Sequence, residues 1–121
     1  MEAEFIATGE EIISGGVIDD NSAYIAGQLT QAGITVTRHI CIGDDPDTLS
    51  ETLLDVGQRA DIAVVTGGLG PTRDDLTTAG AAKAAGVEIS YNRRAMASLE
   101  NYLNRLNRPV SILNKKHACL P

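Results

Sequence analysis

The pattern of hydrophobic and polar positions predicts strands that alternate with helices. Residues 3–8 form a short, mostly apolar run, residues 35–42 alternate, and residues 61–66 read DIAVVT, so we expect three strands there. Apolar residues recur at helical spacing in four segments, which predict helices at about 22–32, from 46 onwards, from the end of the glycine-rich loop (67–75) to about 85, and at 93–106. Residues 87–90 predict a further short strand. This alternation is typical of a parallel sheet covered by helices on both faces.

Local signals indicate where the first two helices begin. Asn21 or Ser22 can cap the first, and Asp45 before Pro46 is a good start for the second. The glycine-rich stretch before Asn21 predicts a long irregular connection.

Composition limits the function classes. With 121 residues, the chain predicts one domain, 1–121, and 43% apolar with 21% charged residues is ordinary for a soluble globular protein. A net charge of -6 and only 3% aromatic residues argue against nucleic-acid binding. Cys41 and Cys119 make neither a disulfide framework nor a zinc site, and Cys41 is expected to be buried. Without a signal-like or membrane-spanning segment, we expect a cytoplasmic protein.

Three loops are expected to meet at the carboxyl edge of the sheet, where α/β proteins bind ligands. They are the segments 8–11, 43–45 and 67–75. The third, GGLGPTRDD, is either a ligand loop, in which glycine backbone approaches a phosphate, or a tight turn. In the turn alternative, Thr72 caps the next helix and Asp75 completes a capping box.

Two carboxylates beside a phosphate would repel it unless a cation lies between them. A hard ion such as Mg²⁺ would suit Asp74 and Asp75, whose alternative role is to favour the helix dipole. Asp45 is expected to be only a cap, which leaves Asp44 as the better candidate ligand in its loop.

Three motifs carry a resemblance to a known family. The segments TGGLGPTRDDLT (66–77), ATGEEIISGGVIDDN (7–21) and IGDD (42–45) resemble the N-terminal domain of the CinA (competence/damage-inducible) family. That domain belongs to the molybdopterin-binding, MoaB/MogA-like superfamily. NKKHACLP (114–121) is similar to a late segment of the family, although His117 departs from it, as do Glu10, Gly16 and Asp20.

The resemblance implies a three-layer α/β/α fold and two alternative functions. One is metal-dependent hydrolysis of ADP-ribose to AMP and ribose 5-phosphate, with K⁺ and Co²⁺ or Mg²⁺. The other is a molybdopterin- or nucleotide-binding module without turnover. It also implies homo-oligomers, and a domain that continues beyond Pro121, sometimes with an amidase domain, so the chain is expected to be incomplete at its C-terminus.

The candidate site follows from these motifs. Asp44, Asp74 and Asp75 are the expected catalytic residues, and Asp44 and Asp74 the expected metal ligands. Thr77 also matches the glycine-loop motif. The residues expected to bind phosphate or substrate are Thr8, Gly9, Glu11, Asn21, Thr66, Gly67, Gly68, Leu69, Gly70, Pro71, Thr72, Asn114 and Lys116.

Overall fold

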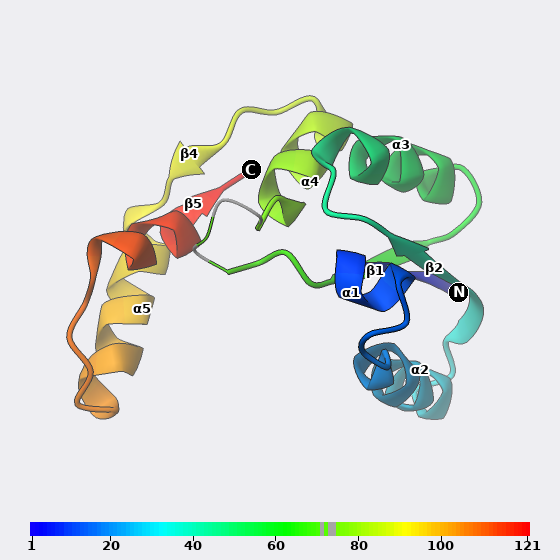
Figure 1. The fold of residues 1–121 in the computed structure, drawn as a ribbon, viewed down its shortest axis with the longest axis horizontal. Helices are drawn as coiled ribbons and strands as arrows, with labels where there is room; N and C mark the ends of the chain where they lie inside the picture. The colour runs from blue at the N-terminus through cyan, green and yellow to red at the C-terminus, as the bar shows by residue number, and fades with distance from the viewer. Residues whose placement is uncertain (71, 73–74) are drawn as a thin grey trace.

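The protein is an α/β domain with a parallel sheet between two helical layers. The computed structural model describes residues 1–70, 72 and 75–121. In Figure 1, α3 and α4 lie on one side of the strands and α2 on the other. The predicted three-layer arrangement is therefore confirmed.

Three parallel strands form the sheet. They are β1 (Glu2–Thr8), β2 (Thr35–Ile42) and β3 (Ile62–Thr66), in the order β2-β1-β3. Phe5 pairs with His39 on one side and with Val64 on the other. Because all three strands run in the same direction, their carboxyl ends meet at one edge, as the sequence predicted.

The helices begin and end close to the predicted positions. They are α1 (Glu10–Ile13), α2 (Asp20–Gln31), α3 (Pro46–Gly57), α4 (Thr77–Ala85) and α5 (Arg93–Arg105). Two predictions were wrong in detail. The connection after β1 contains the short helix α1, and Asp19, rather than Asn21 or Ser22, caps α2 by accepting from the backbone N–H of Ser22.

The main core lies between the sheet and α3. Ile6 and Ile42 of the sheet pack with Leu49 and Val56 of α3. Helix α4 packs on α3 at close range, because a Cβ at Gly80 would lie 2.8 Å from Cδ2 of Leu49. Burial of aliphatic side chains of this size contributes about 1.5–3 kcal/mol each. This core fixes α3 and α4 relative to the strand ends.

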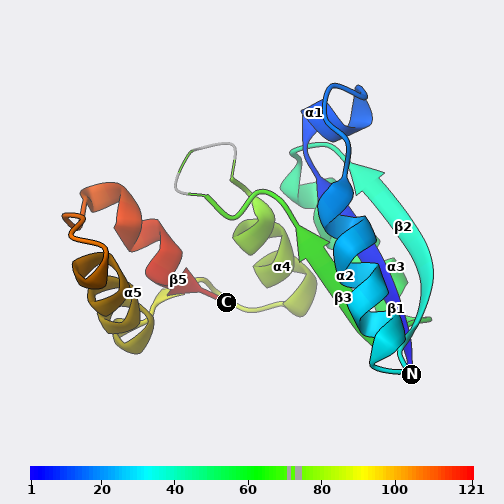
Figure 2. The same ribbon diagram turned by 90° about the horizontal axis from the view of Figure 1, so that it is seen from below.

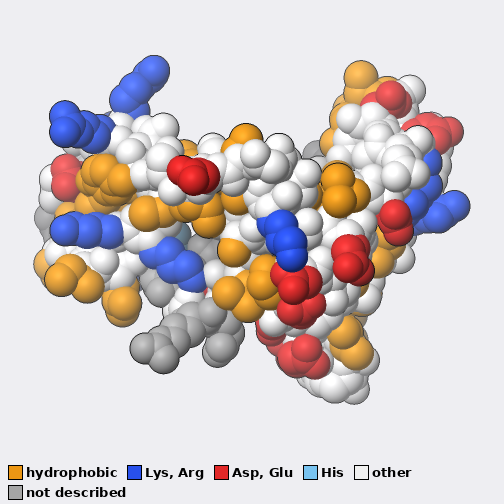
Figure 3. Space-filling model, turned by 90° about the horizontal axis from the view of Figure 1, so that it is seen from above, with side chains coloured by type: hydrophobic (Ala, Val, Ile, Leu, Met, Phe, Trp, Pro, Cys, Tyr) orange, Lys and Arg blue, Asp and Glu red, His pale blue; other side chains and the backbone are white. Residues whose placement is uncertain are grey.

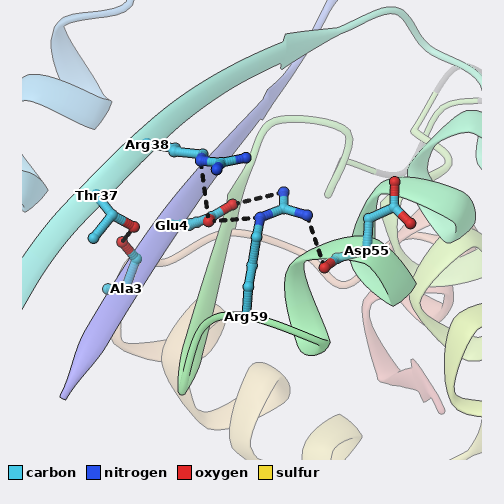
Figure 4. A network of polar contacts seen from close by, with 6 residues as sticks. All are labelled: Ala3, Glu4, Thr37, Arg38, Asp55 and Arg59. Carbon is cyan, nitrogen blue, oxygen red and sulfur yellow. Dashed lines mark hydrogen bonds and ion pairs between the residues drawn. The ribbon is translucent and has the colours of Figure 1, made fainter.

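The buried carboxylate of Glu4 lies near the amino end of the central strand β1, away from the carboxyl edge of the sheet (Figure 4). Glu4 is only 2% exposed, and both of its oxygens accept hydrogen bonds from the Arg59 guanidinium, at 2.8 and 2.9 Å. Arg38 approaches from β2 at 3.7 Å, and Arg59 also donates to the carbonyl of Asp55. The group ties β1, β2 and the end of α3 together, so its role is structural.

Residues 87–121 form a C-terminal arm that projects from the sheet-bearing body (Figures 1 and 2). The arm contains β4 (Ser90–Tyr91), α5, a 3-10 helix η1 (Ile112–Ala118) and β5 (Cys119–Leu120), which pairs antiparallel with β4. The strand predicted at 87–90 thus lies at 90–91. Basic side chains gather over the arm and acidic ones over the body (Figure 3).

The structure also bears on the cysteine and membrane expectations. Cys41 is exposed, so the prediction of a buried thiol was wrong. It lies on β2, at the edge of a three-stranded sheet, where a strand is covered less than a central one. Among the described residues, no helix combines the length and the apolar character needed to span a membrane.

Candidate functional site at the carboxyl edge of the sheet

The ends of β1 and β2 and the start of α4 enclose a small recess. Its lining residues are Thr8, Gly43, Asp44, Asp45, Leu49, Leu76 and Thr77. The recess measures about 10 Å³, which is enough for about one water molecule. A larger ligand would therefore lie across its mouth, against the loops, and would place only one small group inside.

The first glycines of the loop after β3 pack against the threonines of this recess. Gly67 and Gly68 have φ angles of 90° and 59°, which favour glycine. A Cβ on Gly67 would collide with the carbonyl oxygen of Thr8, and one on Gly68 with the hydroxyl of Thr77. The hydroxyl of Thr77 donates to the carbonyl of Gly67 at 2.7 Å. The close approach to Thr8 and Thr77 gives both glycines a structural reason, independent of any ligand.

The second half of the loop is closed by Asp75. Its carboxylate accepts a hydrogen bond from the backbone N–H of Thr72 at 2.8 Å and another from the Thr72 hydroxyl. These bonds, the one from the Thr72 hydroxyl first, hold the pKa of Asp75 below its ordinary value. A Cβ on Gly70 would lie 2.5 Å from the same carboxylate. Asp75 therefore already has a partner inside the loop.

In the alternative of a tight turn, Thr72 and Asp75 form a capping box on the next helix, and the structure contradicts that part of the alternative. Helix α4 begins at Thr77 and its N-cap is Leu76, where no side chain of the described residues makes a capping hydrogen bond. Thr72 and Asp75 instead bond to each other upstream of the helix. The pair thus shapes the loop and does not cap the first turn of α4.

The loop after β2 divides its two aspartates between different roles. Asp45 caps α3, as predicted, by accepting from the backbone N–H and the hydroxyl of Thr48. These bonds, the hydroxyl's first, lower the pKa of Asp45. Asp44 is half-buried in the recess, and its backbone N–H donates to Glu10 at 3.3 Å. Asp44 remains the candidate ligand of this loop.

The remaining predicted residues lie around the same edge or on the arm. Gly9 is buried at the end of β1, whereas Glu11, in α1, and Asn21, in the first turn of α2, are exposed. Thr66 ends β3, and Leu69 is 58% exposed on the glycine loop. Pro71 and Asp74 lie outside the described residues.

The two arm residues have different structural roles. Asn114 caps η1, because its side-chain oxygen accepts from the backbone N–H and the hydroxyl of Ser111, at 2.7 and 2.9 Å. Lys116 reaches the glycine loop and donates to the carbonyl oxygens of Thr72 and Asp75, the latter at 2.7 Å. The side chain of Lys116 thus contacts the glycine loop through two backbone carbonyl oxygens of that loop.

Five lining residues of the recess were missing from the predicted site residues, namely Gly43, Asp45, Leu49, Leu76 and Thr77. Thr77 is buried and joins the start of α4 to the glycine loop. Its signal in the sequence was a hydroxyl residue immediately after a glycine loop and before a helix.

A metal centre is not complete within the described residues. They contain no group of three or more His, Cys, Asp or Glu side chains able to hold an ion. To bind an ion as expected, Asp44 would need Asp74 as a second ligand, and Asp74 lies outside the described residues. The carboxylate of Asp75 is already hydrogen-bonded to Thr72. The described residues alone therefore do not fit a metal ion.

Comparison with known proteins identifies the family. Residues 4–121 match the model described as "Probable molybdopterin binding domain". A CinA-like protein of Desulfosudis oleivorans is 45% identical over the whole chain, and the chain spans 29% of the length of that relative. A CinA-like protein of Desulforapulum autotrophicum is 42% identical, with the same coverage.

Solved structures agree in fold. The crystal structure of CinA from Thermoplasma acidophilum, described as having unknown function, is 30% identical with a TM-score of 0.89. It covers 100% of this chain and 71% of that one. MoaB from Thermus thermophilus matches with a TM-score of 0.65 at 15% identity, and the match covers 96% of this chain and 70% of the MoaB chain. At this identity the match supports the fold alone. The chain belongs to the molybdopterin-binding domain family and is CinA-like over its full length.

Proposed function

We propose that this domain binds a phosphate-bearing small molecule of the pterin class across the mouth of the recess. The observation that carries the proposal is the position of the Gly67–Gly68 backbone at the carboxyl edge, beside the recess that Thr8 and Thr77 line. Glycine backbone can approach a phosphate without an intervening side chain, and its N–H groups can donate to the phosphate oxygens. The family model supports the pterin class.

The electrostatics of the described residues favour binding over metal chemistry. Asp45 is bonded to Thr48, and Asp75 to Thr72, so neither carboxylate needs a cation to account for its place. The Lys116 ammonium donates to the backbone carbonyl of Asp75, so it brings a positive charge to the loop. Exposed Leu69 offers an apolar surface for a flat ring at the same edge.

A binding experiment with recovery of the ligand tests this proposal. Molybdopterin is dialysed anaerobically to equilibrium against the protein, and the recovered ligand is analysed by chromatography. Saturable binding with unchanged ligand is expected. An absence of saturation at millimolar protein, or conversion of the ligand, contradicts a binding module.

A second candidate is metal-dependent hydrolysis of ADP-ribose, which the half-buried position of Asp44 in the recess favours. Because Asp45 already caps α3, Asp44 has no capping role. The test is chromatography of ADP-ribose incubated with and without K⁺ plus Co²⁺ or Mg²⁺. Metal-dependent AMP that Asp44→Asn abolishes supports hydrolysis, and unchanged ADP-ribose contradicts it.

Association with further copies of the chain is also part of the proposal. Basic side chains on the arm and acidic ones on the body are complementary in charge between copies (Figure 3). Sedimentation analysis at low and high salt tests it, and a single monomeric species under both conditions contradicts it.

A further inference from the structure

The Lys116 ammonium joins the arm to the glycine loop. It comes from η1, more than forty positions after the residues that it contacts, and donates to the carbonyls of Thr72 and Asp75. An ammonium group has three N–H donors, so two of them are used on the loop backbone. Only one remains for any ligand.

The segment that carries Lys116 is itself fixed. The Ser111–Asn114 pair caps the start of η1, and at its end the carbonyl of Ala118 accepts from the backbone N–H of Asn92 at 2.7 Å. Asn92 in turn caps α5, through hydrogen bonds to the N–H groups of Arg94 and Ala95. The ammonium is therefore presented by an ordered part of the arm.

We propose that Lys116 is a positioning residue that fixes the backbone of the glycine loop at Thr72 and at Asp75. It acts through two backbone carbonyls, and the loop then places Gly68 and Gly70 against Thr77 and Asp75. The effect on ligand affinity rests on the proposed function, whereas the effect on loop structure does not.

The same contact lowers the electrostatic cost of an anion at this edge. The Thr72 hydrogen bonds first, and the positive charge of Lys116 last, lower the pKa of the Asp75 carboxyl. A bound phosphate would then meet a cation as well as a carboxylate at this edge. As a direct phosphate ligand, by contrast, Lys116 would have only its third N–H to offer while both carbonyls stay bonded.

Three variants test the proposal. Lys116→Met keeps the length and removes the charge, and Lys116→Arg keeps the charge and the donors. Lys115→Met is the matched control, because Lys115 is the exposed neighbour on the same helix. Hydrogen exchange of the ligand-free proteins is followed by mass spectrometry on peptides that cover residues 67–77, β1 and α3.

We expect Lys116→Met to speed exchange in the 67–77 peptide by roughly tenfold, as loss of charge-assisted hydrogen bonds predicts. Exchange in β1 and α3 should not change, and Lys116→Arg and Lys115→Met should match the original chain. Equal exchange in Lys116→Met overturns the proposal. Faster exchange in all peptides overturns it too, because a general loss of stability would explain that result.

Ligand affinity separates positioning from direct binding. We expect Lys116→Met to weaken molybdopterin binding roughly tenfold and Lys116→Arg to restore it. Weaker binding with unchanged loop exchange makes Lys116 a direct ligand and overturns positioning. If the original chain binds no molybdopterin, the proposed function fails, and the exchange result still decides the role of Lys116.

Discussion

The hydroxyl of Thr77, at the first position of α4, donates a 2.7 Å hydrogen bond to the carbonyl oxygen of Gly67, just after β3. The backbone N–H of Thr77 also donates to the carbonyl of Gly68, at 3.1 Å. One threonine thus fixes the turn between a strand end and the following helix. Since Thr8 packs on the same glycines, the central strand shares in the arrangement.

Loss of the Thr77 hydroxyl is expected to destabilise this turn. Thr77→Val keeps the shape and leaves the Gly67 carbonyl without its partner, at a cost of about 1–2 kcal/mol in the free energy of unfolding. Thr77→Ser keeps the hydroxyl and should cost less. Urea unfolding of both variants provides the check, and equal losses would show that the hydrogen bond contributes no more than the methyl group.

Gly68→Ala is expected to destabilise more than Gly86→Ala. Both glycines have positive φ, 59° and 67°, so alanine strains the backbone similarly. Only at Gly68 would the new Cβ also meet the Thr77 hydroxyl, whereas nothing lies within 4 Å at Gly86. We expect an extra loss of about 1–3 kcal/mol from the clash. Thermal or urea unfolding measures it, and equal losses would contradict the close packing.

Removal of the Glu4 charge tests the network at the other end of the sheet. Glu4→Gln leaves Arg59 without its carboxylate, and the expected loss is about 2–3 kcal/mol, reduced because Arg59 is one-third exposed. Asp47→Asn breaks the exposed Asp47–Lys83 pair and should cost much less, because solvent screens that pair. If urea unfolding gave equal losses, the buried pair would contribute no more than a surface one.

Asp75 should make stability depend on acid pH. The Thr72 hydrogen bonds keep its folded pKa below the ordinary value of 3.8, so its contribution is present above that value and is lost as pH falls through the folded pKa. Asp75→Asn should be less stable than the original chain at pH 7, and the gap should narrow at pH 3. Urea unfolding at both pH values measures the gap, with Asp55→Asn as control. A constant gap would contradict the assigned hydrogen bonds.

The strand–helix order could be predicted because its signals are local. The apolar run of β1, the alternation of β2 and the Asp45–Pro46 start of α3 each appear within a few residues. The cap of α2 was misplaced by two or three positions, because Asp19, Asp20, Asn21 and Ser22 are all able to cap and only the backbone decides between them.

The long-range details of the site could not be predicted in the same way. The pairing of Thr72 with Asp75 rather than with α4, and the reach of Lys116 across the fold, depend on backbone geometry that no sequence spacing reports. The exposure of Cys41 likewise follows from its strand being at the edge of a three-stranded sheet.

Amide NMR of the ¹⁵N-labelled chain during an anaerobic titration with molybdopterin tests the central claim most directly. We predict saturable shifts that gather at Thr8, Gly43, Gly67, Gly68 and Thr77, around the mouth of the recess. Saturable shifts confined to the arm or to the Glu4 end of the sheet, or no shifts at all, would contradict a phosphate-binding site at the carboxyl edge.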